Sequence, residues 1–220
     1  MNEHSNFELV VEQAARQDPV FSTNPTLAFF GVGYGARLEL EYEKAELALR
    51  KCTTLDPTYT LGFQILGVLY AEVKQNAKAI ECFRRVLELE CKGIDPEIEE
   101  ENPFFYMGMC YEAIGGLEDA KIAYSKSIES SPRHYESFLR LGRIYHEQND
   151  YLQAIQVYEN ALVTCRRYEP KFLDRILLRG IRLNLDRARN KQSYKEYQPS
   201  EEEKLLDCQL MLEQTKKNEE

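Results

Sequence analysis

The sequence predicts an all-α fold in which short pairs of helices repeat and stack as a solenoid. Residues 135–168 hold two amphipathic segments separated by a turn at Gln148–Tyr151. Neither segment can bury its apolar stripe alone. Residues of this pair recur upstream at a regular interval, as expected of units that stack on copies of themselves.

The recurring cluster in the first helix of each pair is a large aromatic residue, an apolar residue, a glycine and often a tyrosine. It reads Phe29–Val32–Gly33, Phe63–Leu66–Gly67–Tyr70, Phe104–Met107–Gly108–Tyr111 and Phe138–Leu141–Gly142–Tyr145. The glycine spacings are 34, 41 and 34 residues, so the second contains an insertion of seven. A second cluster follows each first one: Ala45–Leu49, Ala79–Phe83, Ala120–Tyr124 and Ala154–Tyr158.

These residue types have structural reasons, and we interpret them as core and not as a site. Glycine on the first helix and alanine on the second let the two helices approach closely, and the aromatic rings fill the wedges that remain. Pro57 and Pro132 close two of the units, because proline cannot continue a helix.

The pattern resembles the tetratricopeptide repeat, a 34-residue unit with Trp-x-x-Leu-Gly-x-x-Tyr, then Ala-x-x-x-Phe, then Pro. The departures are Phe for Trp in every copy, Ala36 at the first Tyr position, and Cys91 and Arg166 at two Pro positions. The resemblance implies a right-handed α-solenoid with capping helices. It covers the four repeats 26–59, 60–93, 101–134 and 135–168.

The segments outside the repeats are predicted to cap or extend the solenoid, whose ends need covering. We expect a capping helix and a connector over 1–25, and an acidic loop insertion at 94–100. Residues 169–192 predict a C-terminal capping helix. Residues 193–220 predict a linker and an acidic tail helix, opened by a capping box of Ser200 and Glu203.

Composition disfavours several classes of partner and location. The formal net charge of −9 opposes binding to nucleic acid or to an anionic membrane. The sequence has no run of about 18 apolar residues, so it predicts no membrane span. The N-terminus does not resemble a signal peptide. The six cysteines lie scattered without a Cys-x-x-Cys pair, which predicts reduced thiols and a cytoplasmic protein.

No catalytic apparatus is predicted, and we expect neither a cofactor nor a metal. His4, His134 and His146 lie far apart in the repeat frame. No Cys and His residues have zinc-ligand spacing, and the glycines of 31–35 fall inside a helix, not in a phosphate-binding loop. The arginines of 166–189 alternate with acids and are interpreted as a solvated helix face. The sequence therefore predicts a protein that is not an enzyme.

The candidate binding residues are those that the repeat leaves free. The resemblance implies that the first helix of each unit lines a concave inner wall. Helical phase then places an apolar floor and a basic end on that wall: Phe30, Tyr34, Ile65, Val68, Phe105, Tyr106, Met109, Arg140 and Arg143. The Lys, Asn and Arg clamp with which some family members hold chaperone tails is missing from the equivalent places.

An apolar wall of this extent predicts a groove for a protein partner. We expect an adaptor or scaffold that binds a peptide or helix with apolar or aromatic residues and an acidic flank. The alternatives are a chaperone for a secretion substrate or an unassembled subunit, and a structural subunit that uses its convex face or its tail helix. The tail helix is also a candidate for self-association. Two further alternatives would make the groove less available to a partner. The N-terminal or C-terminal helix of the chain covers it, or Glu136 and Glu147 neutralise one or both of Arg140 and Arg143.

Overall fold

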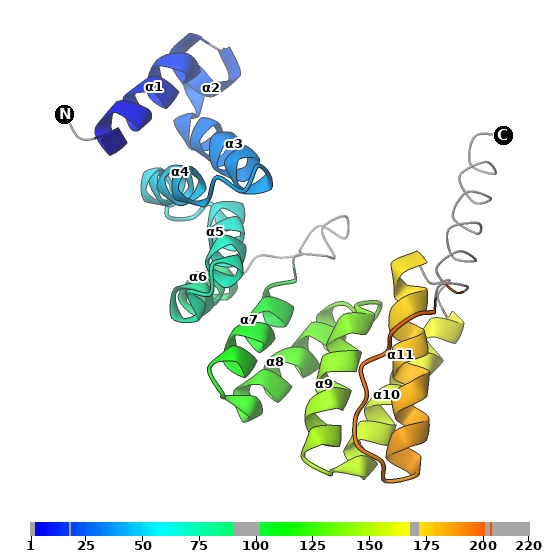
Figure 1. Cartoon of the computed structure of the whole chain (residues 1–220). Helices are drawn as coiled ribbons and strands as arrows, with labels where there is room; N and C mark the ends of the chain where they lie inside the picture. Colours follow the sequence, from blue (N-terminus) through cyan, green and yellow to red (C-terminus); the bar gives the residue numbers. More distant parts are fainter. Residues whose placement is uncertain (1–2, 18, 90–101, 168–171, 201–202, 204–220) are drawn as a thin grey trace, which may run out of the picture. The chain divides into compact units, whose positions relative to one another are not determined.

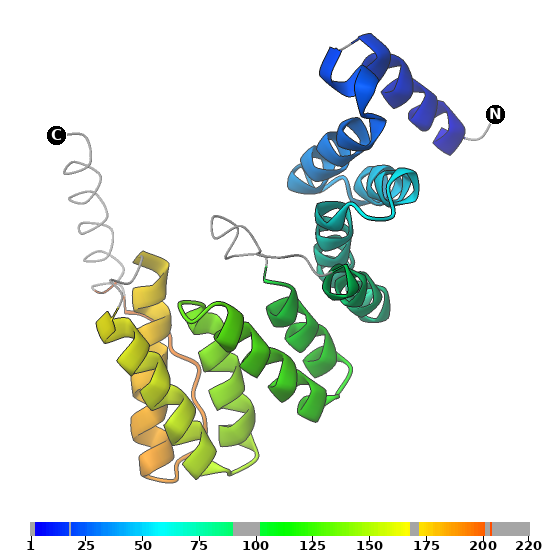
Figure 2. The ribbon, with the colours of Figure 1, turned by 180° about the vertical axis from the view of Figure 1, so that it is seen from behind.

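The structure is a computed structural model that describes residues 3–17, 19–89, 102–167, 172–200 and 203. Within these residues all regular secondary structure is helical (Figures 1 and 2). The helices are α1 (Glu3–Gln17), α2 (Pro19–Thr23), α3 (Pro25–Leu38), α4 (Tyr42–Leu55), α5 (Thr60–Glu72), α6 (Asn76–Glu88), α7 (Pro103–Ala113), α8 (Leu117–Ser130), α9 (Tyr135–Glu147), α10 (Tyr151–Arg167) and α11 (Phe172–Arg189).

The chain divides into two compact units, residues 1–120 and 121–220. Unit 1 contains α1 to α7 and the start of α8. Unit 2 contains the rest of α8, α9 to α11, and an extended segment after α11. The predicted insertion at 94–100 and the tail helix beyond Glu203 lie outside the described residues. A short helix, α2, occupies part of the expected N-terminal connector.

The first helix of each repeat ends in the same turn. One residue there has a left-handed backbone: Leu40, Lys74, Gly115 and Asn149, with φ between 61° and 82°. The next residue donates its N–H to a carbonyl five residues earlier, as in Gln75 to Tyr70 at 2.8 Å, which is the hydrogen bond of a Schellman motif. These four positions are spaced by 34, 41 and 34 residues, so the turns repeat with the same period as the glycines.

The two helices of a repeat pack through the predicted small residues. A Cβ built on Gly33 would lie 2.6 Å from Cγ of Leu49, and one on Gly67 would lie 2.8 Å from Cε1 of Phe83. The same construction on Gly142 meets the ring of Tyr158. The alanines of the second helices are fully buried: Ala45, Ala79, Ala120 and Ala154. The helix-pair fold and its core are therefore confirmed.

The helices that flank the repeats, α1 and α11, pack on the repeats that they adjoin. Val11 of α1 shares a buried cluster with Phe29. In unit 2, α11 packs on α9 and α10, and Leu178 and Ile181 join the cluster around Tyr158. Ser200 and Glu203 make both hydrogen bonds of the predicted capping box, at 2.8 and 3.2 Å.

Cys52 and Cys110 are buried in the core, and Cys82 is half-buried. Burial raises the pKa of Cys52 and of Cys82 to about 12, and that of Cys110 to about 11. A buried thiol resists ionisation because the apolar surroundings cannot solvate a thiolate. These thiols are therefore neutral over the physiological pH range.

Replacing Gly142 by alanine should destabilise unit 2, because the new methyl group meets the fully buried ring of Tyr158. We expect a loss of about 1–3 kcal/mol in the free energy of unfolding. Gly31 is the matched control, since a Cβ there meets nothing within 4 Å. Gly31→Ala should raise the free energy of unfolding by up to about 1 kcal/mol, because alanine lowers the backbone entropy of the unfolded chain. Urea titration followed by circular dichroism measures both, and equal effects would contradict this packing.

The buried thiols should make stability fall at alkaline pH. The pKa of each thiol in the folded protein lies above the ordinary value of 9.0, so the unfolded chain loses its thiol protons first as the pH rises. The contribution of these thiols to the free energy of unfolding is therefore complete below about pH 9 and is lost as the pH rises toward about 12. Each thiol contributes up to about 1.4 kcal/mol per pH unit in that window. Urea titrations between pH 8 and about 11 on wild type and Cys52→Ala should show a shallower decline in the variant. Parallel declines would contradict the assignment to this thiol.

Candidate functional site

The inner face of α3 carries an exposed aromatic surface in unit 1. The rings of Phe30 and Tyr34 stack with 6.0 Å between centroids, and Phe30 also meets Tyr59 edge-on at 5.3 Å. Tyr34 is 38% exposed, and Leu38, one turn further on, is 62% exposed. Of the predicted groove residues, Tyr34 is therefore accessible to solvent, and Leu38 extends the exposed surface.

The prediction that α5 and α7 present an exposed apolar floor is wrong at three positions. Ile65, Val68 and Phe105 are 3%, 0% and 5% exposed. The reason is that α5 contacts α4 and α6 and also the neighbouring first helices α3 and α7, so that its inner face is covered. Even the polar side chain of Gln64 is buried there.

Tyr106 and Met109 of α7 are half-buried. The ring of Tyr106 stacks on Phe83 of α6, with centroids 5.8 Å apart, and meets Phe105 edge-on. Tyr106 therefore joins α7 to the preceding repeat as well as presenting part of its ring to solvent. Its packing role was not predicted, because helical phase placed it opposite the packing face.

The two arginines at the predicted basic end lie on α9 in unit 2. Arg140 donates two hydrogen bonds to one carboxylate oxygen of Glu136, both at 3.1 Å, so the neutralising alternative is confirmed for this residue. Arg140 and Arg143 line a cavity of about 250 Å³. The far side of the cavity is formed by residues that follow α11: Tyr194, Glu196 and Tyr197.

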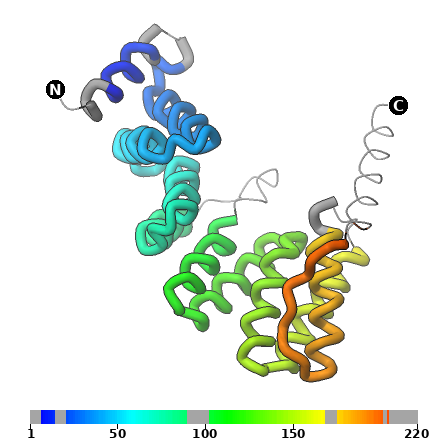
Figure 3. Tube along the Cα trace, viewed as in Figure 1, coloured from blue at the N-terminus to red at the C-terminus, as the bar shows by residue number. Residues whose placement is uncertain are grey.

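Those residues belong to an extended segment, 192–199, which we call the strap (Figures 1 and 3, orange). α11 ends in a Schellman motif with Lys191 left-handed at φ 52°, and the chain turns back along the helix. The strap has no regular secondary structure. The alternative in which the chain covers its own groove therefore holds for α9, through the linker and not through a terminal helix.

α11 binds the backbone of the strap with two side chains. Asn184 is fully buried. It donates to the carbonyl of Lys195 at 2.8 Å and accepts the N–H of Lys195 at 2.9 Å. Arg187 donates to the carbonyl of Ser193 at 2.6 Å. At Gly180 an added Cβ would lie 3.3 Å from Cβ of Tyr197, so the missing side chain makes room for the strap.

α9 holds the other edge of the strap. Nε2 of the buried His146 donates to the carbonyl of Gln192 at 2.6 Å, and the His146 ring meets Tyr194 edge-on at 6.0 Å. Burial is the main cause that raises the pKa of the Tyr194 hydroxyl. The sequence analysis missed these residues. Two features of the sequence could have indicated them. Gly180 lies inside a predicted helix, and Asn184 is a polar residue on the same helix side as the apolar Ile181.

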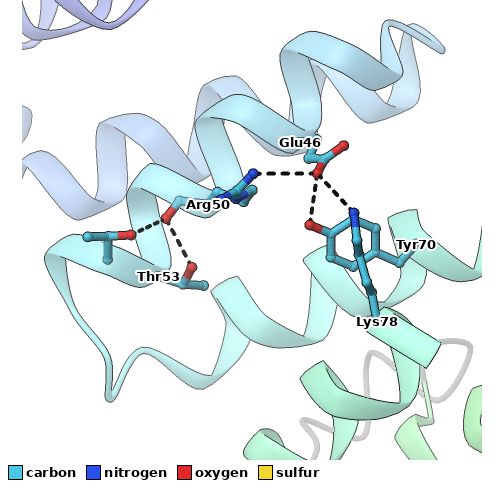
Figure 4. A network of polar contacts seen from close by, with 6 residues as sticks. Glu46, Arg50, Thr53, Tyr70 and Lys78 are labelled. Atoms are coloured by element: carbon cyan, nitrogen blue, oxygen red, sulfur yellow. Dashed lines mark hydrogen bonds and ion pairs between the residues drawn. The ribbon is translucent and has the colours of Figure 1, made fainter. Parts of the chain in front are cut away.

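A separate polar cluster joins α4 to the next repeat in unit 1 (Figure 4). The Tyr70 hydroxyl donates to Glu46 at 2.9 Å, and Arg50 and Lys78 lie 3.9 Å from the same carboxylate. Burial, followed by this hydrogen bond, raises the pKa of Tyr70. The cluster borders a cleft of about 820 Å³ whose lining mixes four basic and two acidic side chains: Arg50, Lys78, Arg84, Arg85, Glu81 and Glu88.

Within the described parts of the chain, no three His, Cys, Asp or Glu side chains lie close enough together to hold a metal ion. No helix there is both long and apolar enough to cross a membrane. Two surfaces stand out among the described residues. One is the exposed aromatic face on α3, and the other is the groove on α9 and α11 whose hydrogen-bonding groups hold the extended strap.

Comparison with known proteins places these repeats in a family. Residues 63–90 and 123–156 each match the tetratricopeptide repeat. Among curated proteins, anaphase-promoting complex subunit 3 of Schizosaccharomyces pombe is 23% identical over 124 residues, 56% of this chain and 18% of that protein. The chain therefore spans less than a fifth of that relative.

Solved structures show the same fold at low sequence identity. The structure of MamA aligns with a TM-score of 0.57 and 18% identity, over 76% of this chain and 88% of that one. YrrB, described as a tetratricopeptide repeat protein with an unusual peptide-binding site, aligns with a TM-score of 0.55 and 15% identity, over 79% and 90%. These structures show the shared fold, and the two repeat matches together with the repeated helix pairs show that the chain contains tetratricopeptide repeats.

Proposed function

We propose that the chain is a non-enzymatic interaction module, an adaptor or scaffold that holds a segment of a partner protein on the inner faces of its repeats. The observation that carries this proposal is the strap. A groove of α9 and α11 already holds an extended polypeptide through side-chain bonds to its backbone, which is one way in which domains bind peptides. YrrB supports the proposal, since its description names a peptide-binding site.

In unit 1 the proposed partner contact is the aromatic face of α3. Phe30 and Tyr34 form a stacked pair beside the exposed Leu38. Aromatic side chains contribute large contact areas and dominate many interfaces. Because Ile65, Val68 and Phe105 are buried, the binding surface there is narrower than the groove inferred from helical phase. An apolar or aromatic residue of the partner is the side chain that fits it.

A role as a subunit of a larger assembly is the second candidate. It is favoured by the similarity to a protein named as a subunit of the anaphase-promoting complex. A chaperone would use the same inner faces, and a client that leaves the complex would distinguish it from an adaptor. An adaptor and a chaperone would both use the inner faces, whereas a structural subunit would use the convex face or the tail helix.

The test is selection of peptides from a random-peptide display library on the full chain, followed by titration of the selected peptides. Tyr34→Ala should weaken their binding by about 1–3 kcal/mol, as loss of an aromatic anchor does. Tyr42→Ala is the matched control, because Tyr42 is similarly exposed, at 36%, and begins α4. Equal binding by wild type, Tyr34→Ala and Tyr42→Ala would reject α3 as the contact surface.

A further inference from the structure

The strap runs along α11, and the spacing of the contacting residues is similar on the two segments. Arg187, Asn184 and Gly180 follow each other at three or four residues along the helix and meet Ser193, Lys195 and Tyr197 in turn. Three or four helical residues span about 4.5–6 Å, and two extended residues span about 6.6 Å. α11 therefore contacts every second residue of an extended chain.

These bonds do not depend on the side chains of the strap. His146, Asn184 and Arg187 all bind backbone atoms, at Gln192, Lys195 and Ser193. Among the described residues, no backbone–backbone hydrogen bond involves 193–199. Any extended segment offers the same backbone donors and acceptors. The groove can therefore exchange one segment for another without losing these bonds.

Side chains of the strap also contact the groove. Tyr194 lies against His146, and Tyr197 lies over Gly180. Between them Glu196 lines the same cavity as Arg140 and Arg143. Oppositely charged groups thus face one cavity, with an aromatic ring on each side of the acid in the sequence.

The strap also leaves the groove partly unfilled. The cavity of about 250 Å³ has apolar walls from Leu139, Ile176 and Leu177 in addition to its charged groups. That volume exceeds the roughly 30 Å³ that one water molecule occupies in the liquid. A segment with a larger side chain here would bury apolar surface that the strap leaves uncovered.

We propose that the groove between α9 and α11 is a binding site for an extended partner segment with two aromatic residues three positions apart and an acidic residue just before the second. The chain's own strap occupies the site until such a segment displaces it. This inference rests on the proposed function for the claim that inner faces bind partner segments. It adds the chemistry of the ligand and a competing occupant.

The competition has a measurable consequence. A tethered segment acts at an effective concentration in the millimolar range, so a free peptide of the same sequence should bind the wild-type groove weakly. Weakening the strap without altering the groove should restore its affinity, since the fraction of open grooves rises. Tyr194→Ala combined with Tyr197→Ala does this, because both residues belong to the strap and not to α9 or α11.

The probe is a fluorescein-labelled synthetic peptide of residues 191–200, titrated by anisotropy into the full chain. The double tyrosine variant should bind it at least about 10-fold more tightly than wild type. Adding Asn184→Ala to that variant should reduce the affinity about 10-fold, because the bonds to the peptide backbone are lost. A peptide with both tyrosines replaced by alanine is the control and should bind less tightly than the intact peptide.

A second measurement avoids the variants. Excess peptide added to wild type should speed hydrogen exchange over 192–199, where the Lys195 amide is bonded to Asn184. Equal peptide affinity of wild type and the double variant, with unchanged exchange, would overturn the proposal. So would concentration-dependent dimers that form instead of the peptide complex, since they assign the groove to a second copy. Neither result bears on the α3 surface, whose test uses library peptides and Tyr34.

Discussion

The close approach of two helices within each repeat is the constraint on which the rest of the structure depends. Gly67 lets the ring of Phe83 lie directly on α5, and Gly142 does the same for Tyr158 on α9. An aromatic ring on one helix and no side chain on the other fixes the rotation of both helices about their axes. That rotation decides which side chains point into the pair and which are left for neighbouring repeats, for the chain's own segments or for a partner.

Whether the outward face of a first helix is buried or exposed depends on the position of that helix in its unit. In unit 1, α5 has a first helix of another repeat on each side, and its inner residues Ile65 and Val68 become core. α3 presents Tyr34 and Leu38 to solvent. In unit 2, α9 is covered on its inner side by the strap. Which of these faces is exposed therefore differs from repeat to repeat and does not follow the repeat pattern itself.

Local features were predictable from the sequence. Glycine spacing, aromatic rings and turn residues act within one helix pair, so the repeats and their core followed from periodicity, and the Glu136–Arg140 pair followed from its spacing of four residues. The site was only partly predictable, because helical phase shows where a side chain points and not what covers it. The bonds of Asn184 to Lys195 and of His146 to Gln192 join segments that carry no repeat and no motif. Only the fold brings them together.

The two surfaces differ in the kind of energy that they offer a ligand. On α3 the stacked pair of Phe30 and Tyr34 offers apolar area and few backbone ligands, so binding there depends on side-chain burial and changes little with salt. The groove of α9 and α11 offers fixed donors and acceptors, and Asn184 is already desolvated. Asn184 also donates to the carbonyl of Gly180, a bond within α11 that does not depend on the strap. Its two bonds to Lys195 are the ones that an incoming segment would have to replace, because hydrogen bonds that are lost without replacement reduce the affinity.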